Sequence, residues 1–174
     1  MRKLLLGAAM LLFAQMGFGQ AVSDQAVIPV SVTLNSILRL TVTAGGNIQF
    51  VVNTMDQYQN GISIVSDQYT TKYKVASSND YVVTLAADAA NLLGIESGSA
   101  MDIAFIEYTA TGGAAAGGAL TLTDFSAPEN IATDPAGTID TYEIAWRLTA
   151  GLLALDLPAD VYTVNVFLQV QPQP

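Results

Sequence analysis

The stretch that decides the fold is Q-A-V-I-P-V-S-V-T-L-N-S-I-L-R-L-T-V-T, from Gln25 to Thr43. Apolar side chains occupy nearly all of its even positions from Ala26 to Val42, and most of its odd positions are polar. A period of two is typical of a β-strand with one buried face, because successive side chains point to opposite faces. Pro29 cannot donate a backbone hydrogen bond, so we expect its half of the stretch at a sheet edge, at a bulge, or in the groove of another molecule.

Further alternating runs follow along the chain and are separated by residues typical of turns. They are Ile48 to Val52, Tyr69 to Ala76, Tyr81 to Ala87, Asp102 to Tyr108, Thr141 to Thr149 and Val161 to Val170. Asn60-Gly61 favours a type I′ hairpin before the next short run, and only Ala86 to Leu93 looks helical. Many short alternating strands with turns between them predict an all-β antiparallel sandwich or barrel.

The beginning of the chain has the organisation of a secretory signal peptide. A basic start is followed by a short apolar core, Leu4 to Phe13, and then by the small residues Gly17 and Gly19, which suit cleavage before Gln20. A membrane-spanning helix needs about 20 apolar residues, and this run is shorter. The pattern therefore predicts a cleaved signal peptide rather than a membrane anchor.

The signal peptide sets the expected domain organisation. Residues 1–19 are removed, and residues 20–174 form one domain that begins with the alternating strand 20–43. We expect no transmembrane span in this mature chain and a secreted location. The whole chain contains no cysteine, so packing and the sheet ladder must provide its stability without disulfides.

The mature chain is strongly acidic. The sequence has six basic and 15 acidic residues, and two of the basic ones lie in the signal peptide, so four basic and 15 acidic residues leave a net charge of −11. Such a chain repels phosphate backbones, which argues against nucleic acid as a partner.

The chemistry-bearing residue types are few. The absence of histidine and cysteine excludes Ser-His-Asp and Cys-His catalysis and the metal sites built on imidazole or thiolate. Carboxylates such as Asp156 and Asp160 flank turns, where Asp normally caps the turn and remains solvated; a glycosidase pair or a calcium site is the alternative there. The sequence predicts no enzyme, no catalytic residue, no metal ligand and no cofactor.

Aromatic residues provide one alternative function. Trp146 and most of the seven tyrosines lie on the apolar side of an alternating run, which favours packing. Tyr58, beside Asn60-Gly61, is the exception. Tyr58 and Trp146 are the ligand-binding aromatics of the alternative, a secreted carbohydrate-binding or adhesive module with a glycan partner. A small outer-membrane barrel is less favoured, because most runs are shorter than the roughly 9–11 residues of a membrane strand.

The opening stretch has two interpretations. In the first, Ala26 to Leu34 and Leu38 to Val42 are the first strands of their own sandwich. In the second, Ala26 to Leu34 is a donor strand that completes the sheet of a neighbour, and Asn35-Ser36 separates it from its own domain. Its apolar ladder for self-assembly is then Ile28, Val30, Val32 and Leu34.

The tail L-P-A-D-V-Y-T-V-N-V-F-L-Q-V, Leu157 to Val170, resembles the last strand of secreted bacterial pilin-like domains, in which L-P-A-G-x-Y precedes alternating apolar residues. Tyr73 to Leu85 resembles their central hairpin, and the opening strand resembles the N-terminal segment of fimbrial subunits and of spore-coat-U-like domains. In this chain Asp160 takes the place of the usual Gly, and the cysteine pair of many chaperone-usher pilins is missing.

The resemblance implies a single immunoglobulin-like antiparallel β-sandwich at the bacterial cell surface. It implies a structural subunit of a secreted filament or matrix, which partners with itself as a homopolymer or with other surface subunits. Polymerisation by donor-strand complementation is the mechanism that the opening strand suggests.

Overall fold

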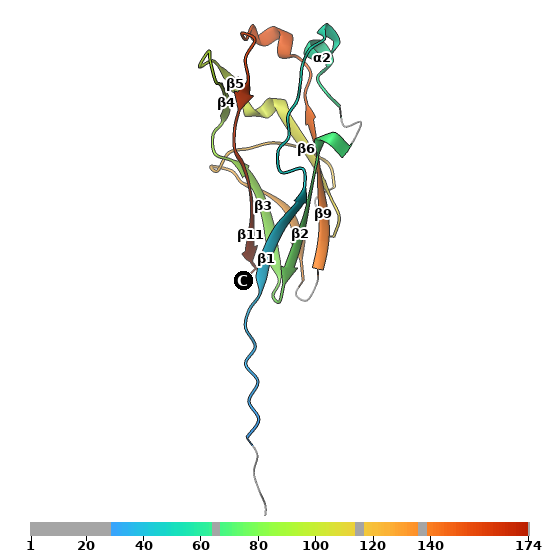
Figure 1. Ribbon diagram of the computed structural model, residues 1–174, viewed down its shortest axis with the longest axis vertical. Coiled ribbons are helices and arrows are strands. Elements are labelled where there is room, and N and C mark those ends of the chain that lie inside the picture. Colours follow the sequence, from blue (N-terminus) through green and yellow to red (C-terminus); the bar gives the residue numbers. More distant parts are fainter. Residues whose placement is uncertain (1–28, 64–66, 114–116, 136–138, 174) are drawn as a thin grey trace, which may run out of the picture. The chain divides into compact units, whose positions relative to one another are not determined.

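The computed structural model describes residues 29–63, 67–113, 117–135 and 139–173 (Figure 1). The chain divides into two units, Met1–Leu34 and Asn35–Pro174, and each is described by itself. In the first unit, residues 29–34 form no strand, and Val30, Val32 and Leu34 are 85%, 79% and 90% exposed. The expected signal peptide and Ile28 lie outside the described residues.

The antiparallel strands of the second unit form three sheets. The largest sheet has the order β1-β2-β9-β6-β7, with bounds Leu38–Ala44, Thr70–Ser77, Ile139–Leu148, Ile106–Thr111 and Ala119–Thr121. The second has the order β11-β3-β8, with bounds Val166–Pro172, Tyr81–Ala87 and Glu129–Asp134. The third is a small sheet, β10-β4-β5, with bounds Tyr162–Thr163, Asn91–Gly94 and Ala100–Asp102. The helical turns are α2 (Met55–Asn60), η2 (Asp67–Tyr69), η3 (Ile103–Phe105) and η4 (Leu152–Leu155).

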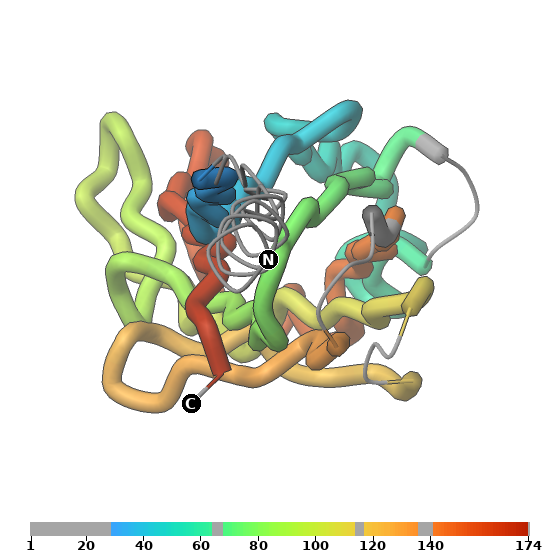
Figure 2. The backbone as a smooth tube through the Cα atoms, turned by 90° about the horizontal axis from the view of Figure 1, so that it is seen from below, coloured from blue at the N-terminus to red at the C-terminus, as the bar shows by residue number. Residues whose placement is uncertain are grey.

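The inward faces of the two larger sheets share one core. Buried residues alternate along β2, β3, β6 and β9, as expected for strands with one face turned to a core. In the end-on view the strands surround the interior that these side chains fill (Figure 2). The expected all-β antiparallel sandwich is confirmed.

The strand order corresponds to that of an immunoglobulin-like sandwich, in which A-B-E-D form one sheet and C-F-G the other. In their order across the sheet, β1, β2, β9 and β6 take the places of A, B, E and D, and β3 and β11 take those of C and F. Among the described strands, none pairs with the second edge of β11, where strand G belongs.

Several local predictions are wrong. The predicted run Asp102 to Tyr108 is interrupted by η3, and β6 begins only at Ile106. Asn60-Gly61 does not form a hairpin but ends α2, and Gly61 caps this helix with a φ of 74°. The helix exists because Thr54 and Gln57 form a capping box, in which each side chain bonds the backbone N–H of the other. Ala86 to Leu93 is not a helix, because it contains the end of β3 and most of β4.

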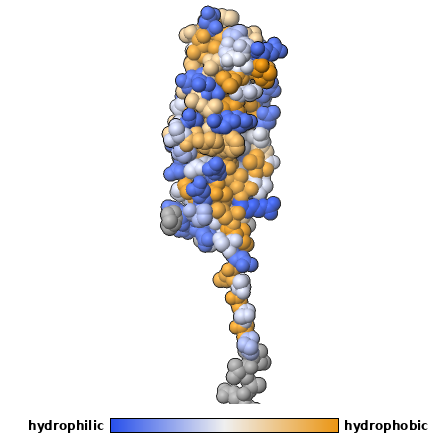
Figure 3. All heavy atoms as spheres, turned by 90° about the vertical axis from the view of Figure 1, so that its left-hand side faces the viewer, coloured by the Kyte–Doolittle hydropathy of each residue, from blue (hydrophilic) through white to orange (hydrophobic). Residues whose placement is uncertain are grey.

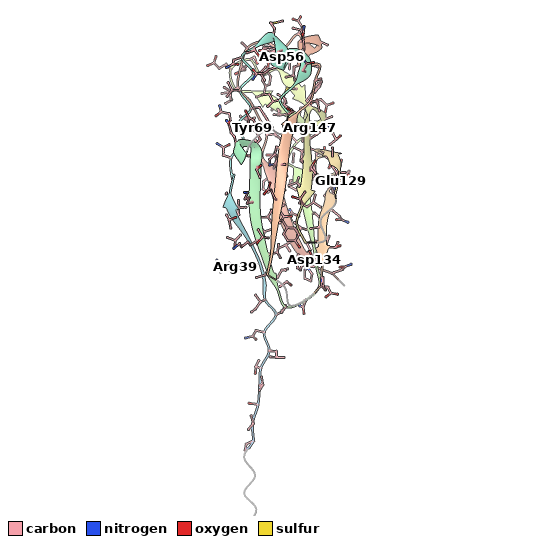
Figure 4. The ribbon with its side chains drawn as sticks, turned by 90° about the vertical axis from the view of Figure 1, so that its right-hand side faces the viewer. Arg39, Asp56, Tyr69, Glu129, Asp134 and Arg147 are labelled. Carbon is pink, nitrogen blue, oxygen red and sulfur yellow. The ribbon has the colours of Figure 1, made fainter. Side chains whose placement is uncertain are left out.

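Buried tyrosines dominate one half of the core. The rings of Tyr73 and Tyr142 stack with centroids 5.0 Å apart, and the hydroxyl oxygens of Tyr81 and Tyr142 lie 2.6 Å apart. The Tyr142 hydroxyl donates to the carboxylate of Asp134, which lies near the end of the sandwich opposite Asp56 (Figure 4). Burial raises the pKa of Tyr73, Tyr108 and Tyr142 well above the ordinary value.

We expect these tyrosines to make the fold sensitive to alkali. In the unfolded chain they lose protons near pH 10, whereas in the folded chain they keep them, so the free energy of unfolding falls as pH rises above 10. Three such groups give a slope of about 4 kcal/mol per pH unit. Urea unfolding midpoints between pH 9 and pH 12 measure this slope.

Tyr73→Phe is the matched variant for that experiment. Within the described residues, the buried hydroxyl of Tyr73 has no hydrogen-bond partner. Removing it should leave stability at pH 7 unchanged or raise it by about 1 kcal/mol, and should reduce the alkaline slope by about a third. An unchanged slope would show that Tyr73 is not responsible.

Candidate functional site

A long apolar groove runs along the second unit. It lies between β1 with the segment that follows it and β11 with the segment that precedes it. Its volume is about 850 Å³. The first wall comprises Val42 and residues 45–52, and the second wall comprises residues 157–166 and Leu168. The floor consists of core side chains, among them Leu85, Leu122, Ile144, Trp146 and Leu148. The groove therefore opens directly onto the hydrophobic core.

The first wall is an extended segment without a partner strand. Ile48, Phe50 and Val52 are half-buried and alternate with exposed residues, as in the strand that the sequence predicts, but no ladder is formed there. Gly45 turns the chain into this wall with a φ of 64°, and a Cβ at this position would lie 1.9 Å from the carbonyl oxygen of Thr70. The Phe50 ring stacks on Tyr69 with centroids 4.9 Å apart, which holds the wall against β2.

Both edge strands turn backbone hydrogen-bonding groups toward the groove side. In β11 the odd-numbered residues face β3, since Asp88 N donates to Asn165 O at 2.9 Å and Gln173 N donates to Asp80 O at 2.8 Å. In an antiparallel strand the alternate residues bond the opposite edge, so Val166, Leu168 and Val170 direct their N–H and C=O groups away from β3. The edge strand β1 has the same arrangement on the other side.

The groove is closed at one end. Strands β1 and β11 approach each other within 8 Å between Cα atoms, and the start of β1 lies beside the end of β11 (Figure 1). A strand inserted between them would need about twice the 4.8 Å spacing of neighbouring strands, so none fits there. Pro172 ends β11 there and has no N–H to offer. The other end lies beside α2 and η4, which contribute Tyr58 and Leu152 to the lining (Figure 1).

The two aromatic residues suggested for glycan binding both line this groove. Trp146 is only 6% exposed, its indole N–H donates to the Thr71 hydroxyl at 2.9 Å, and its ring packs against Tyr108. Tyr58 is half-buried and packs against the core. They therefore do not form an exposed platform for a sugar ring.

The residues suggested for self-assembly lie in the other unit. Val30, Val32 and Leu34 alternate with Ser31 and Thr33, and all five side chains are exposed. The alternation of apolar and more polar side chains along this segment is visible in Figure 3. The chain thus carries both an exposed apolar ladder with a two-residue repeat and an apolar groove bordered by unpaired strand edges.

Other kinds of site find no support in the described part of the chain. It contains no group of three or more acidic side chains placed to hold a metal ion. None of its helices has the length and apolar character required to cross a bilayer.

These features define a class of structure: an antiparallel β-sandwich that lacks, among its described strands, the partner of one edge and has an apolar groove in that place. No protein-family model matches the chain, and a search of curated proteins finds no match either.

Proposed function

We propose that this protein is a structural subunit of a secreted surface filament or matrix, which polymerises by donating residues 26–34 of one copy to the groove of the next. The observation that carries the proposal is the complementarity within one chain: a groove at a sheet edge that none of the described strands covers, and an exposed segment with apolar residues at every second position.

The donor segment suits the groove in side-chain chemistry. Its ladder of Ile28, Val30, Val32 and Leu34 would meet a floor of Leu, Ile and Trp side chains. Burying each of these side chains is worth about 1.5–3 kcal/mol before the entropic cost of association. Together the four side chains contribute about 6–12 kcal/mol before that cost.

The donor segment also suits the groove in backbone chemistry. A strand between the first wall and β11 would satisfy unpaired N–H and C=O groups on both sides, as in other cases of β-strand addition. Pro29 removes one donor on one side only, which an added strand tolerates near its end. The same pairing would cover two exposed strand edges, which otherwise promote aggregation.

A secreted subunit of this kind agrees with the rest of the sequence. The predicted signal peptide directs export, and the absence of cysteine leaves a fold that must gain stability from packing alone. Completion of the sandwich by a neighbour supplies such packing. Localisation at the bacterial surface, and other surface subunits as partners, belong to the same proposal.

Trp146 provides a direct test, because it is the only tryptophan and lies in the floor of the groove. A peptide of residues 26–34 is titrated into mature Val32→Asp protein, which keeps its own groove but carries a defective donor. We expect saturable binding, a change in Trp146 emission and a rise in melting temperature of at least about 5 °C. A peptide with Val30 and Val32 both changed to Asp serves as the control. Equal effects of the two peptides, or no effect of either, would refute strand donation.

A second candidate function has one observation in its favour. Phe125 and Phe167 are exposed, and their rings lie 5.2 Å apart beside the sheet β11-β3-β8. A carbohydrate-binding or adhesive module would use this pair to stack on a sugar ring. Glycan-array binding by the Val32→Asp protein that is lost in Phe167→Ala would support this function.

A further inference from the structure

The chain is anchored to its own domain immediately after the donor segment. The Ile37 N–H donates to the Ser78 hydroxyl, and the Ser78 N–H donates to the Ile37 carbonyl, both at 2.8 Å. The Asn79 side-chain amide also donates to the Ser36 hydroxyl at 2.8 Å. Only Asn35 separates Leu34 from these bonds to the turn between β2 and β3. Two residues of extended chain span at most about 7 Å, so a donated Leu34 must remain close to the β2–β3 turn of its own copy.

The form of the groove decides where that turn can lie. A donor strand cannot extend past the end where β1 and β11 approach each other within 8 Å. Leu34 must therefore leave at the end beside α2 and η4, and Ala26 must point toward the closed end. The donor then runs parallel to β1 and antiparallel to β11. The β2–β3 turn of the donating copy is consequently held against the α2 end of the accepting copy.

The α2 end carries an exposed apolar rim beside the groove. Leu93, Ile95 and Val161, which we call the rim, are 55%, 67% and 55% exposed, and Val161 also lines the groove. The rim is held in shape by Asp160, whose carboxylate accepts the N–H groups of Glu96, Ser97 and Val161. These bonds join the β4–β5 turn to the second wall, so the rim is formed before any partner arrives.

Both ends carry exposed apolar side chains, and Arg39 gives the β2–β3 end a positive charge beside the carboxylates of Asp80 and Asp134. The α2 end has the carboxylates of Asp56, Glu96, Asp156 and Asp160. The β2–β3 end has an exposed Ile37, at 59%, and an exposed Arg39 that forms no ion pair within the described residues. Figure 4 shows Asp56 and Arg39 at opposite ends of the sandwich.

From this geometry we infer that the rim is a second subunit interface, which docks the β2–β3 end of the next copy with Ile37 against the rim and Arg39 toward the acidic side chains. The inference rests on the proposed function, since strand donation brings the two ends together. The partner is a second copy of this chain, because a linker of one residue leaves no room for another molecule between them. The polymer is accordingly a head-to-tail stack with two contacts at each junction.

Disulfide crosslinking tests the inference in a protein without native cysteines. The mature full chain receives Ile37→Cys together with a cysteine at one rim position in turn, and diamide oxidises each close pair of thiols to a disulfide. We expect a ladder of covalent oligomers on a non-reducing gel for at least one rim position. The matched control combines Ile37→Cys with Gln169→Cys, an exposed position on β11 toward the closed end, and should remain monomeric on the gel.

The outcomes separate this inference from the proposed function. Filaments that crosslink through Gln169→Cys, or through neither position, would keep strand donation and overturn the rim interface. If no filaments form and the 26–34 peptide does not bind, both the rim interface and strand donation are refuted.

Reversing the charge of Arg39 tests the rim interface independently of the crosslinks. Arg39→Glu would face the acidic α2 end of the next copy with a like charge, and we expect assembly at low salt to slow by about tenfold. Lys72→Glu, the same change further along β2 from the turn, should have little effect. Binding of the 26–34 peptide should be equal in both variants, because the peptide has no β2–β3 end. Equal assembly rates for the two variants would contradict the inference.

Discussion

We expect a single aspartate in place of Val32 to abolish polymerisation and to leave a folded monomer. Val32 lies in the middle of the donor ladder, is 79% exposed in its own chain and has no role in its own core. The change therefore costs the monomer almost nothing. In the polymer it removes about 1.5–3 kcal/mol of apolar burial, which alone is about one to two orders of magnitude in affinity, and it places a charge in a groove floored by apolar side chains.

Thr33→Asp is the matched control for this experiment. It adds the same charge to the adjacent residue, but on the opposite face of the segment, where a strand lying in the groove points its side chains outward. We expect Thr33→Asp protein to form filaments at close to the normal rate, and both variants to have the circular dichroism spectrum and melting temperature of the monomer. Negative-stain microscopy and sedimentation measure assembly. Normal filaments from Val32→Asp protein would show that residues 26–34 are not donated.

The strands that form the core could be predicted, because apolar and polar residues alternate along each of them in the sequence. Tyr81 to Ala87 is strand β3, and the runs assigned to β2 and β9 lie within two residues of the observed bounds. These strands have one face on the core, so burial and periodicity give the same information. The run Val161 to Val170 is instead divided between β10 and β11, which belong to different sheets.

The helix α2 and the false helix at Ala86 to Leu93 show where local patterns mislead. Thr54 and Gln57 form a capping box that outweighs the turn preference of Asn60-Gly61. The alanines at 86 and 87 have high helix propensity, but both are buried at the end of β3. Tertiary packing decided the conformation there.

The groove could not be predicted, because it arises where two sheet edges remain unpaired, and local sequence does not show whether a strand edge has a partner. Ile48, Phe50 and Val52 alternate in the same way as a paired strand, and the sequence contains no sign that their ladder is absent. The alternating apolar face of Val30, Val32 and Leu34 could be predicted, since a period of two is visible in the sequence wherever its partner lies. The position of Trp146 in the groove floor depends on a hydrogen bond to Thr71, which is 75 residues away in sequence.

Replacement of Trp146 by alanine should destabilise the monomer by about 3–5 kcal/mol. The indole packs against Tyr108 in the floor of the groove and donates to the Thr71 hydroxyl. Its removal leaves a large cavity and breaks that hydrogen bond, while the Thr71 hydroxyl keeps its bond to the Gly45 carbonyl. Trp146→Phe keeps an aromatic ring and should lose less than half as much. Urea unfolding followed by tyrosine fluorescence measures both variants.

The same pair of variants separates the structural role of Trp146 from its role in assembly. If the indole is part of the floor on which the donor ladder rests, Trp146→Phe protein should remain folded at 25 °C yet bind the 26–34 peptide about tenfold more weakly, because one donor side chain loses its contact surface. Thr71→Val leaves the ring in place and removes both hydrogen bonds of the hydroxyl, to the Trp146 indole and to the Gly45 carbonyl. Its peptide affinity should stay close to normal while its stability falls by about 1–3 kcal/mol. Equal peptide affinity in all three proteins would mean that the donor strand does not reach the part of the groove above Trp146, and that the ladder occupies only the walls nearer α2.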